Sequence, residues 1–295
     1  MSSAEKTALI MEGGAMRGMF TAGVTDVMME NDITFDGAAG TSAGAAYGCN
    51  FKSHQIGRVI RYHKKYCRDR RFASLWSLFK TGDLFGADFC YYEIPDKLDK
   101  FDRETFKNSP MEFYVTCTDI VTGKPVYHRC DNADKNDIEW MRASASIPMA
   151  AEIVKIDGKL LLDGGMTDSI PVRFMKNLGY DKCVVILTQP FGYIKKKNNM
   201  IPLLKIKYKE YPNLIKALKN RHIMYNETLK YIEEQEKAGR LLAIRPPEAL
   251  EIKHVSHKPE ELERVYQIGR KVCAENLQRI KDFLITEHTG PKLMK

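Results

Sequence analysis

The sequence predicts an α/β fold in which a mostly parallel or mixed sheet is covered by helices on both faces. Short apolar runs alternate along the chain with longer segments whose apolar residues recur at helical spacing. Two tight turns, at residues 121–123 and 157–158, each separate two short apolar runs and indicate antiparallel hairpins. The 295 residues are 44% hydrophobic, which is enough for a substantial core.

Strands and helices are expected in alternation along the chain. A strand over residues 7–11 precedes a helix over 19–29, and a strand over 35–39 precedes an alanine-rich helix that begins after Ser42. Further strands are expected at 112–118, 124–129, 183–188 and 241–245, with a hairpin over 153–162. Further helices are expected at 54–67, 137–146, 170–178, 214–236 and 259–285. Residues 74–100 have a mixed pattern in which Pro95 is predicted to open a helix.

The cysteines argue against a disulfide framework and against a zinc site. The seven cysteines are odd in number and scattered, and no pair has the C-x-x-C spacing. This usage favours a reducing compartment. The first residues are polar and lack the apolar stretch of a signal peptide, and no run of about 18 apolar residues exists that would span a membrane. We therefore expect a cytoplasmic protein that needs no metal and no cofactor.

A candidate nucleophile lies in the sequence Gly-Thr-Ser-Ala-Gly at residues 40–44, directly after the apolar run at 35–39. A serine on a sharp strand-to-helix turn needs small neighbours because the backbone is crowded there, and Gly40 and Gly44 remove Cβ atoms that would clash. The turn presents the hydroxyl of Ser42 at the end of a sheet, near a helix N-terminus that favours negative charge. The pattern suits a nucleophile, although the same spacing also occurs by chance.

A second glycine-rich turn, Glu-Gly-Gly-Ala-Met-Arg-Gly at residues 12–18, joins the first strand to the first helix. Successive small residues can aim their backbone N–H groups at one point and hold an anion. A dinucleotide-binding turn is disfavoured because Ala15 replaces its middle glycine and the next strand lacks a terminal acid. A P-loop is disfavoured because no Gly-Lys-Ser/Thr follows. An oxyanion hole beside Ser42 fits best, and a plain strand-to-helix connection is the structural alternative.

A third glycine turn, Asp163-Gly164-Gly165, follows the apolar residues 160–162. Asp-Gly is among the commonest turn pairs, so an ordinary turn is the default interpretation for this motif alone. At the end of a strand, however, the two glycines leave the carboxylate open to a partner. Beside the other two turns, a functional role for Asp163 becomes the favoured interpretation.

Taken together, these turns resemble the motifs of the patatin-like phospholipase family, over about residues 7–190. Residues 13–18 are similar to the family's glycine-rich oxyanion loop with its basic residue, and residues 40–44 to its nucleophile elbow. Residues 163–165 resemble its Asp-Gly-Gly/Ala motif, and Arg-Ala-Ser-Ala-Ser-Ile-Pro at 142–148 resembles the stretch that precedes that aspartate. Ala15 departs from the pattern, since many members have a third glycine there. The remainder resembles the C-terminal extension of some bacterial members.

The resemblance implies a three-layer patatin-like fold, a hydrolase core at 1–190 and a mainly helical extension at 191–295 packed on it. It implies a Ser42–Asp163 dyad that cleaves lipid esters through an acyl-enzyme, as in phospholipases A and lysophospholipases. Backbone N–H groups of Gly13, Gly14 and Ala15 would form the oxyanion hole. The supporting positions would be Arg17, Gly18, Gly40, Gly44, Gly164 and Gly165. Because a free Asp has a pKa of about 3.9, direct proton transfer requires a desolvated carboxylate whose pKa is raised.

Two other functions are open to this sequence. In a carboxylesterase with a Ser-His-Asp triad, one of His222, His254 and His257 would reach the site and the substrate would be a soluble ester. These histidines lie in the polar C-terminal part, without a strand-end context. A non-catalytic lipid-binding protein of the same shape is the other alternative.

The net charge of +8 is concentrated in one segment. Residues 195–221 contain nine Lys and Arg but one acid, Glu210, and apolar and aromatic residues are interleaved with the cations. We expect the segment Lys195–Arg221 to make peripheral contact with an anionic membrane, or to form a lid over the site. A solvated basic face is the alternative, and nucleic acid is disfavoured because no binding motif accompanies the charge. The sequence does not predict the oligomeric state.

Overall fold

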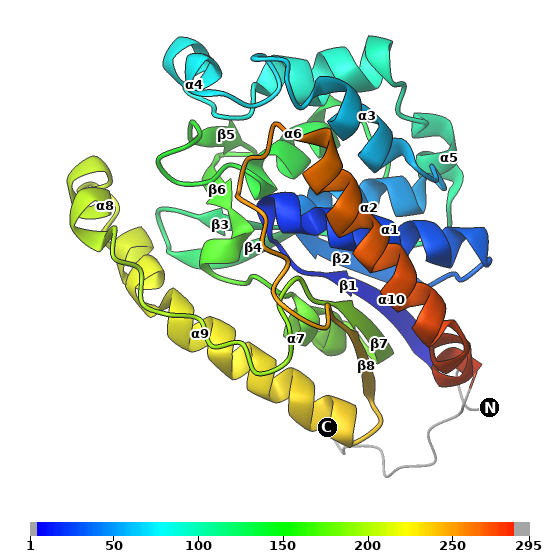
Figure 1. Ribbon diagram of the computed structural model, residues 1–295. Coiled ribbons are helices and arrows are strands. Elements are labelled where there is room, and N and C mark those ends of the chain that lie inside the picture. The colour runs from blue at the N-terminus through cyan, green and yellow to red at the C-terminus, as the bar shows by residue number, and fades with distance from the viewer. Residues whose placement is uncertain (1–4, 286–295) are drawn as a thin grey trace.

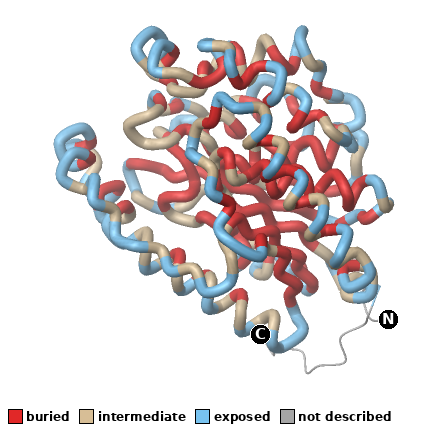
Figure 2. Tube along the Cα trace, in the orientation of Figure 1, coloured by how far each residue is buried: buried red, intermediate tan, exposed pale blue. Residues whose placement is uncertain are grey.

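The protein, seen here as a computed structural model that describes residues 5–285, is built around one eight-stranded sheet with helices on both faces (Figure 1). This arrangement confirms the predicted α/β class with a mixed sheet. Figure 2 shows that the buried residues concentrate in the sheet and in the helices that lie directly against it. Among the described residues, none of the helices has the length and apolar character required to cross a bilayer.

The elements follow one another closely in the order that the sequence predicts. The strands are β1 (Lys6–Met11), β2 (Gly37–Thr41), β3 (Glu112–Asp119), β4 (Lys124–Arg129), β5 (Val154–Ile156), β6 (Lys159–Asp163), β7 (Tyr180–Ile186) and β8 (Leu241–Ile244). The α-helices are α1 (Gly18–Glu30), α2 (Ala43–Lys52), α3 (Arg58–Tyr66), α4 (Leu75–Thr81), α5 (Arg103–Asn108), α6 (Lys135–Ser144), α7 (Val172–Asn177), α8 (Ile201–Lys207), α9 (Pro212–Lys237) and α10 (Pro259–Ile285). Three other helical turns are η1 (Ala15–Arg17), η2 (Phe89–Leu98) and η3 (Gly164–Met166).

Strand β1 lies near the middle of the sheet. The order β3-β2-β1-β7-β8 is parallel throughout, as expected where helices connect successive strands. At the other end, β4 and β6 pair with β3 in antiparallel fashion, and β5 pairs with β6. The two hairpins predicted from their turns, β3–β4 and β5–β6, are therefore both present.

Alternate residues of the central strands pack into two separate cores. Leu9 and Met11 of β1 join the larger core with α1, α2 and α10, whereas Ala8 and Ile10 join a second core with α7 and α9. This two-residue period is the one that a strand buried on both faces requires. The layers on either side of the sheet are thus set by the sequence of the strands themselves.

The register on β3 brings two distant segments together at one point of the sheet. Along one edge of β3, residues 112–116 pair with β2 and residues 117–119 pair with β6. Along the opposite edge, residues 114–119 pair with β4. The last residue of β2, Thr41, lies beside Thr116, and the last residue of β6, Asp163, lies beside Cys117. The two strands run in opposite directions and their C-terminal ends meet there.

The region between residues 74 and 100 differs from the expectation. Pro95 does not open a helix but lies inside η2, a turn of wide π-type geometry. The wider turn accommodates a residue that has no N–H and would break the regular α-helical hydrogen-bonding pattern. Three short helices, α4, α5 and α8, were also not predicted from the sequence. Of these, α4 projects from the molecule (Figure 1).

The segment after residue 190 contributes to the same sheet and to the larger core. Strand β8 extends the sheet beyond β7, and α10 packs along α1. The two helices approach closely because each has a glycine at the contact. A Cβ on Gly23 of α1 would lie 2.1 Å from the Tyr266 carbonyl oxygen of α10, and a Cβ on Gly269 of α10 would lie 2.1 Å from the Phe20 carbonyl oxygen of α1. The Tyr266 hydroxyl donates to Asp26 at 2.7 Å across this contact.

Candidate active site

Ser42 occupies the turn between β2 and α2 in a strained backbone conformation. Its φ of 56° and ψ of −122° lie outside the regions that residues with a Cβ ordinarily adopt. Gly40 and Gly44 make the turn possible, since a Cβ at either position would lie 2.3 Å from a backbone carbonyl oxygen. The sharp turn places Ser42 at the N-terminus of α2, as in the predicted elbow.

The structure brings the Ser42 hydroxyl and the Asp163 carboxylate together. Ser42 Oγ donates a hydrogen bond to Asp163 Oδ2 at 2.6 Å, and both residues are more than nine-tenths buried. The other carboxylate oxygen, Oδ1, accepts from the N–H of Gly165 at 2.7 Å. Burial raises the pKa of Asp163 above its usual value, while the hydrogen bonds from Ser42 and Gly165 oppose that rise. Gly164 lets this turn pass β3, since a Cβ there would lie 2.1 Å from the Thr116 carbonyl oxygen.

The end of α6 connects the serine turn to the aspartate turn. The Ser144 hydroxyl accepts from the N–H of Ser42 at 3.0 Å and donates to the Thr116 carbonyl at 2.6 Å. The Ser146 carbonyl accepts from the N–H of Asp163 at 2.8 Å. These two serines belong to the stretch at 142–148 that the sequence singled out, but the sequence indicated no role for either side chain.

The glycine-rich loop lies against Ser42, with one difference from the expectation. A Cβ on Gly13 would be 3.1 Å from the Ser42 Cβ, so the two turns are in contact. The Gly13 N–H, however, donates to the Ser169 carbonyl at 3.2 Å and is therefore not a free donor as predicted. Within residues 5–285, no hydrogen-bond partner is found for the N–H groups of Gly14 and Ala15. Ala15 has a φ of 49°, so it adopts a positive φ although it carries a Cβ where many family members have glycine.

Arg17 and Gly18 follow this loop. Arg17 Nε makes a long hydrogen bond, 3.4 Å, to the Thr188 hydroxyl at the end of β7, and within the described residues it forms no salt bridge. Gly18 allows α1 to approach α2, since a Cβ would lie 2.7 Å from the Tyr47 ring.

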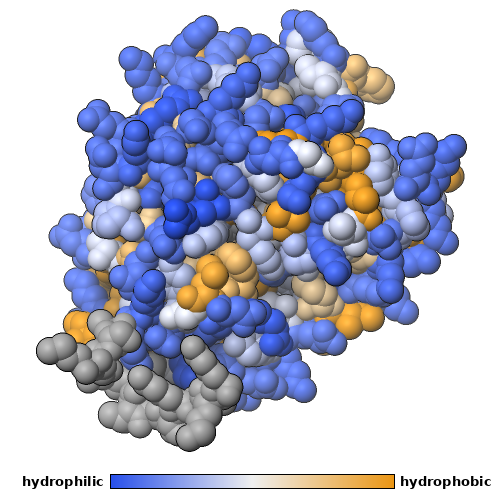
Figure 3. Space-filling view, turned by 180° about the vertical axis from the view of Figure 1, so that it is seen from behind, coloured by the Kyte–Doolittle hydropathy of each residue, from blue (hydrophilic) through white to orange (hydrophobic). Residues whose placement is uncertain are grey.

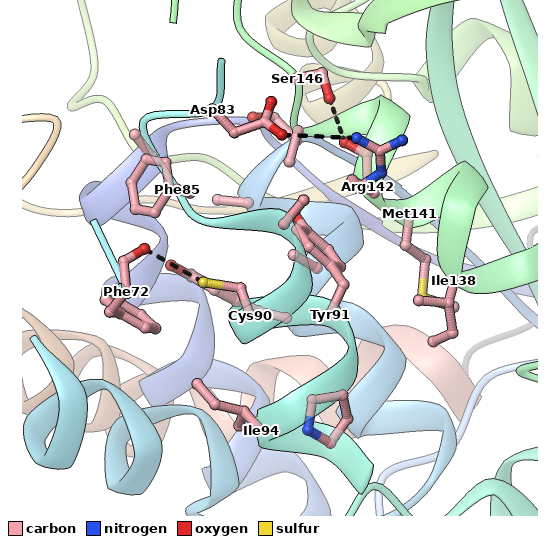
Figure 4. Close-up of a pocket in the computed structure, with 18 of the residues that line it drawn as sticks. Phe72, Asp83, Phe85, Cys90, Tyr91, Ile94, Ile138, Met141, Arg142 and Ser146 are labelled. Carbon is pink, nitrogen blue, oxygen red and sulfur yellow. Dashed lines mark hydrogen bonds and ion pairs between the residues drawn. The ribbon is translucent and has the colours of Figure 1, made fainter. Parts of the chain in front are cut away.

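An apolar pocket extends from Ser42 into the protein. Ala15 and Ser42 lie in its wall, together with aromatic and aliphatic side chains from α2, α3, η2 and α6. Figure 4 shows Phe72, Phe85, Tyr91 and Ile94 around this space, with the ion pair of Asp83 and Arg142 at one side. No local pattern in the sequence indicates this pocket, because its walls come from segments spread between residues 15 and 151.

No described histidine hydrogen-bonds to Ser42 or Asp163. His257 contacts the Cys67 carbonyl, His254 is exposed, and His222 has a buried Nδ1 atom without a partner among the described residues. One group of potential metal ligands lies elsewhere, at His128, Cys130 and Asp137. The Asp137 carboxylate there already accepts hydrogen bonds from His128 and from two backbone N–H groups, which explains the cluster as a structural contact before α6.

Three further groups near the site were not found from the sequence. Arg221 of α9 donates from Nε to the Gly165 carbonyl. The buried Glu12 accepts from the Tyr225 hydroxyl and from the Thr188 N–H, at 2.5 and 2.6 Å. Asp168 is half-buried and accepts a hydrogen bond from Tyr127 at 2.7 Å, and desolvation raises its pKa to about 6. Glu12 precedes the first glycine turn and Asp168 follows the third. The sequence alone does not show that these turns lie at the same edge of the sheet.

Comparison with known families gives two matches along the chain. A family model described as patatin-like phospholipase matches residues 9–176, more than half of the chain. A second, described as a domain of unknown function (DUF6363), matches residues 211–285. The first includes all three glycine turns, and the second includes α9, β8 and α10.

Several known proteins are similar to this chain. The uncharacterized protein YjjU of Escherichia coli is 27% identical over 294 residues, which covers 96% of this chain and 80% of YjjU. Lysophospholipase NTE1 of Chaetomium globosum is 28% identical over 189 residues, 60% of this chain and 11% of that protein. Lysophospholipase nte1 of Aspergillus terreus is 25% identical over 296 residues, 93% of this chain and 18% of that protein. The chain thus spans less than a fifth of either fungal protein.

Two solved structures are similar to this chain at low identity. VipD from Legionella pneumophila has a TM-score of 0.47 and 12% identity, with 94% of this chain and 68% of that chain covered. The type III effector protein ExoU has a TM-score of 0.43 and 11% identity, with 96% and 54% covered.

Proposed function

The chain belongs to the patatin-like phospholipase family, and from that premise we propose that it is a serine hydrolase that releases fatty acids from lysophospholipids or phospholipids. One observation carries the proposal: the 2.6 Å hydrogen bond between Ser42 Oγ and Asp163 Oδ2, beside an apolar pocket. The similarity to fungal lysophospholipases supports a lipid ester as the substrate.

Acyl transfer begins with attack of Ser42 Oγ on the ester carbonyl carbon. As the O–C bond forms, the hydroxyl proton moves to Asp163 Oδ2, along the hydrogen bond that already exists. The tetrahedral intermediate then expels the alcohol of the lipid, which takes the proton from Asp163. A water molecule attacks the acyl-enzyme by the reverse sequence of proton transfers, and the fatty acid leaves. Burial of Asp163 raises its pKa and so makes it a stronger base than an exposed aspartate.

The N–H groups of Gly14 and Ala15 are the proposed donors to the oxyanion. They lie on the loop that contacts Ser42, and no described residue accepts hydrogen bonds from them. Fixed donors of this kind contribute roughly 3–4 kcal/mol each to a transition state. The positive φ of Ala15 holds the loop in a conformation that aims successive N–H groups toward one side.

The apolar pocket is the proposed site of the acyl chain. Its wall reaches from Ser42 to Phe101 and is lined mainly by aromatic and aliphatic groups. Removal of an alkyl chain from water contributes about 0.8 kcal/mol per methylene, so a chain that fills the pocket binds strongly. Substrates with longer acyl chains should therefore be preferred until the pocket is full.

We also propose that the segment Lys195–Arg221 contacts anionic membranes. Ile194, Met200, Leu203 and Ile206 are all exposed, between exposed lysines of the same segment. Leu204 and Tyr208 are buried and fix α8 to the protein. Figure 3 shows the opposite side of the molecule from Figure 1, where hydrophobic residues form separate patches within a mainly hydrophilic surface. Co-sedimentation with anionic vesicles tests this contact: neutralising five of the lysines should abolish it.

Fatty-acid release from a purified lysophospholipid tests the proposed hydrolase. We expect release by the unmodified protein and none above background by Ser42→Ala, because the nucleophile is lost. The variants His222→Ala, His254→Ala and His257→Ala should each retain activity. Loss of activity in one of these, with the fold intact, would support a Ser-His-Asp triad instead.

A further inference from the structure

Three cations lie at the edge of the site. Arg17 follows the glycine-rich loop, Lys195 lies after β7, and Arg221 lies in α9. All three are half-buried, and within residues 5–285 none of them forms a salt bridge. Half-buried cations usually have a carboxylate partner, because desolvation of a charge is unfavourable. Three together without one indicate a place prepared for an anion.

Contacts with the catalytic loops fix where these cations lie. Arg221 Nε donates to the Gly165 carbonyl, and Arg221 Nη2 lies 3.3 Å from where a Gly165 Cβ would be, two residues after Asp163. Arg17 Nε reaches Thr188, whose hydroxyl lies 2.7 Å from where a Cβ of Gly14 would be. Arg221 is therefore next to the base, and Arg17 is next to the proposed oxyanion donors.

Lys195 is held in the same place by aromatic packing. Its Nζ lies 4.4 Å from the centre of the Tyr225 ring, and the Tyr225 hydroxyl donates to Glu12. The Lys195 backbone exchanges two hydrogen bonds with the Asn226 side chain, at 2.9 and 3.1 Å. Burial is the main cause that lowers the pKa of Lys195 to about 8, and the positive charges of Arg221 and Arg17 lower it further. The negative charge of Glu12 opposes this change. The three cations are thus close enough to repel one another.

Two acids lie within electrostatic range of the cluster, Glu12 near Lys195 and Asp163 near Arg221, but among the described residues neither forms a salt bridge with a cation. Glu12 accepts from Tyr225 and Thr188, and Asp163 accepts from Ser42 and Gly165. Desolvation and the charges of Arg17, Arg221 and Lys195 lower the pKa of His254, so all three cations lie within electrostatic range of that side chain. The apolar pocket begins on the other side of Ser42, and none of the three cations lies in its wall.

We propose that Arg17, Lys195 and Arg221 form a subsite for the phosphate group of a lipid substrate. An acyl chain in the apolar pocket and an ester at Ser42 leave the alcohol part of the lipid on the side of these cations. Guanidinium and ammonium groups bind phosphate oxygens through charge-assisted hydrogen bonds. The inference rests on the proposed function and adds to it the residues that hold the phosphate group; a neutral glyceride lacks the group that this subsite binds.

Binding to Ser42→Ala protein tests the subsite without any catalysis. The probes are decyl phosphate, decanol and inorganic phosphate, measured by calorimetry. Lys195→Gln in the Ser42→Ala background should weaken decyl phosphate binding about tenfold or more, because one charge-assisted hydrogen bond is lost. Lys237→Gln is the matched control, since Lys237 is exposed and lies outside the segment Lys195–Arg221. It should leave that affinity within twofold.

Three results would overturn the assignment. Equal weakening of decyl phosphate and decanol by Lys195→Gln would mean a general structural defect. Equal affinity for decyl phosphate in both lysine variants would mean that Lys195 binds no anion. Inorganic phosphate that binds as tightly as decyl phosphate would mean a site for a free ion instead of a lipid headgroup.

Kinetics on an active serine separate this inference from the proposed function. The substrates are 1-octanoyl lysophosphatidic acid and 1-octanoylglycerol, which share one acyl chain. We expect Arg221→Gln to lower the ratio of kcat/KM for the first to that for the second about tenfold or more. Lys237→Gln, at the C-terminal end of the same helix and outside the segment Lys195–Arg221, should leave the ratio unchanged. Hydrolysis of both with an unaltered ratio would overturn the subsite alone, whereas hydrolysis of neither would overturn the proposed function.

Discussion

The two parts of the chain, residues 5–190 and 191–285, meet at the same edge of the sheet but supply different things. The first supplies the proposed nucleophile, base and oxyanion donors, each on a tight turn fixed by strand pairing. The second supplies Lys195 and Arg221, along with an outer strand and the helix against α1. The reacting groups, Ser42 and Asp163, need exact positions, which the pairing of the strands provides. The cations Lys195 and Arg221 have long side chains, so they can reach the same site from outside the central strands.

Glycine serves both parts, but with different consequences. Gly44 lets the backbone of the serine turn pass β1, so a change there alters the site directly. Gly269 lets α10 lie against α1, far from Ser42 in the chain and on a regular helix. Substitutions in the two parts should therefore separate activity from stability.

The largest expected effect is that of Asp163→Asn, which removes the base but keeps nearly the same shape. We expect kcat to fall by about 10²- to 10⁴-fold, because a positioned general base contributes that much. Asparagine can still accept from Gly165, so the melting temperature should stay close to that of the parent. A loss of less than tenfold would contradict the proposed role of Asp163.

The next largest effect is expected for Gly44→Ala. The added Cβ would lie 2.3 Å from the Met11 carbonyl oxygen, so β1 and the serine turn must move apart. We expect a loss of about 1–3 kcal/mol in the free energy of unfolding, with a large loss of kcat in the folded protein. Denaturant unfolding and a soluble-ester assay measure the two. Full activity in the variant would show that the turn tolerates this displacement.

Gly269→Ala tests the second part of the chain in the way that Gly44→Ala tests the first. Its Cβ would lie 2.1 Å from the Phe20 carbonyl oxygen, which forces α10 away from α1. The free energy of unfolding should again fall by about 1–3 kcal/mol, but kcat per folded molecule should be unchanged because no residue of the site moves. If kcat fell as much as in Gly44→Ala, the two parts would be coupled more tightly than their contacts indicate.

The smallest effect is a displacement of the pH profile. Burial raises the pKa of Asp163, and the base must be deprotonated to accept a proton, so kcat/KM should fall as the pH falls through that raised pKa. The midpoint of this acid limb should lie above about 4, the range of an ordinary carboxylate. Asp168→Asn is the control, because its own pKa is about 6. A limb that disappears in this variant belongs to Asp168, and one at or below 4 contradicts the raised pKa of Asp163.

The sequence was sufficient for the order of elements and for the residues of the three glycine turns, because both depend on local pattern. It did not predict that the Gly13 N–H is occupied by Ser169, since that contact joins segments more than 150 residues apart. Pro95 was misassigned because the preference of proline for a helix start is only a tendency, and here a wider turn contains it. Arg221 carried no local signal, since a cation in a basic helix is usually solvated.

The most direct test of the Ser42–Asp163 pair is peptide mapping after reaction with a fluorophosphonate, which modifies an activated serine hydroxyl. Rapid labelling is expected at Ser42 in the unmodified protein, none at that position in Ser42→Ala, and labelling slowed at least tenfold in Asp163→Asn. Rapid labelling in Asp163→Asn, or labelling of a serine other than Ser42, would contradict the account.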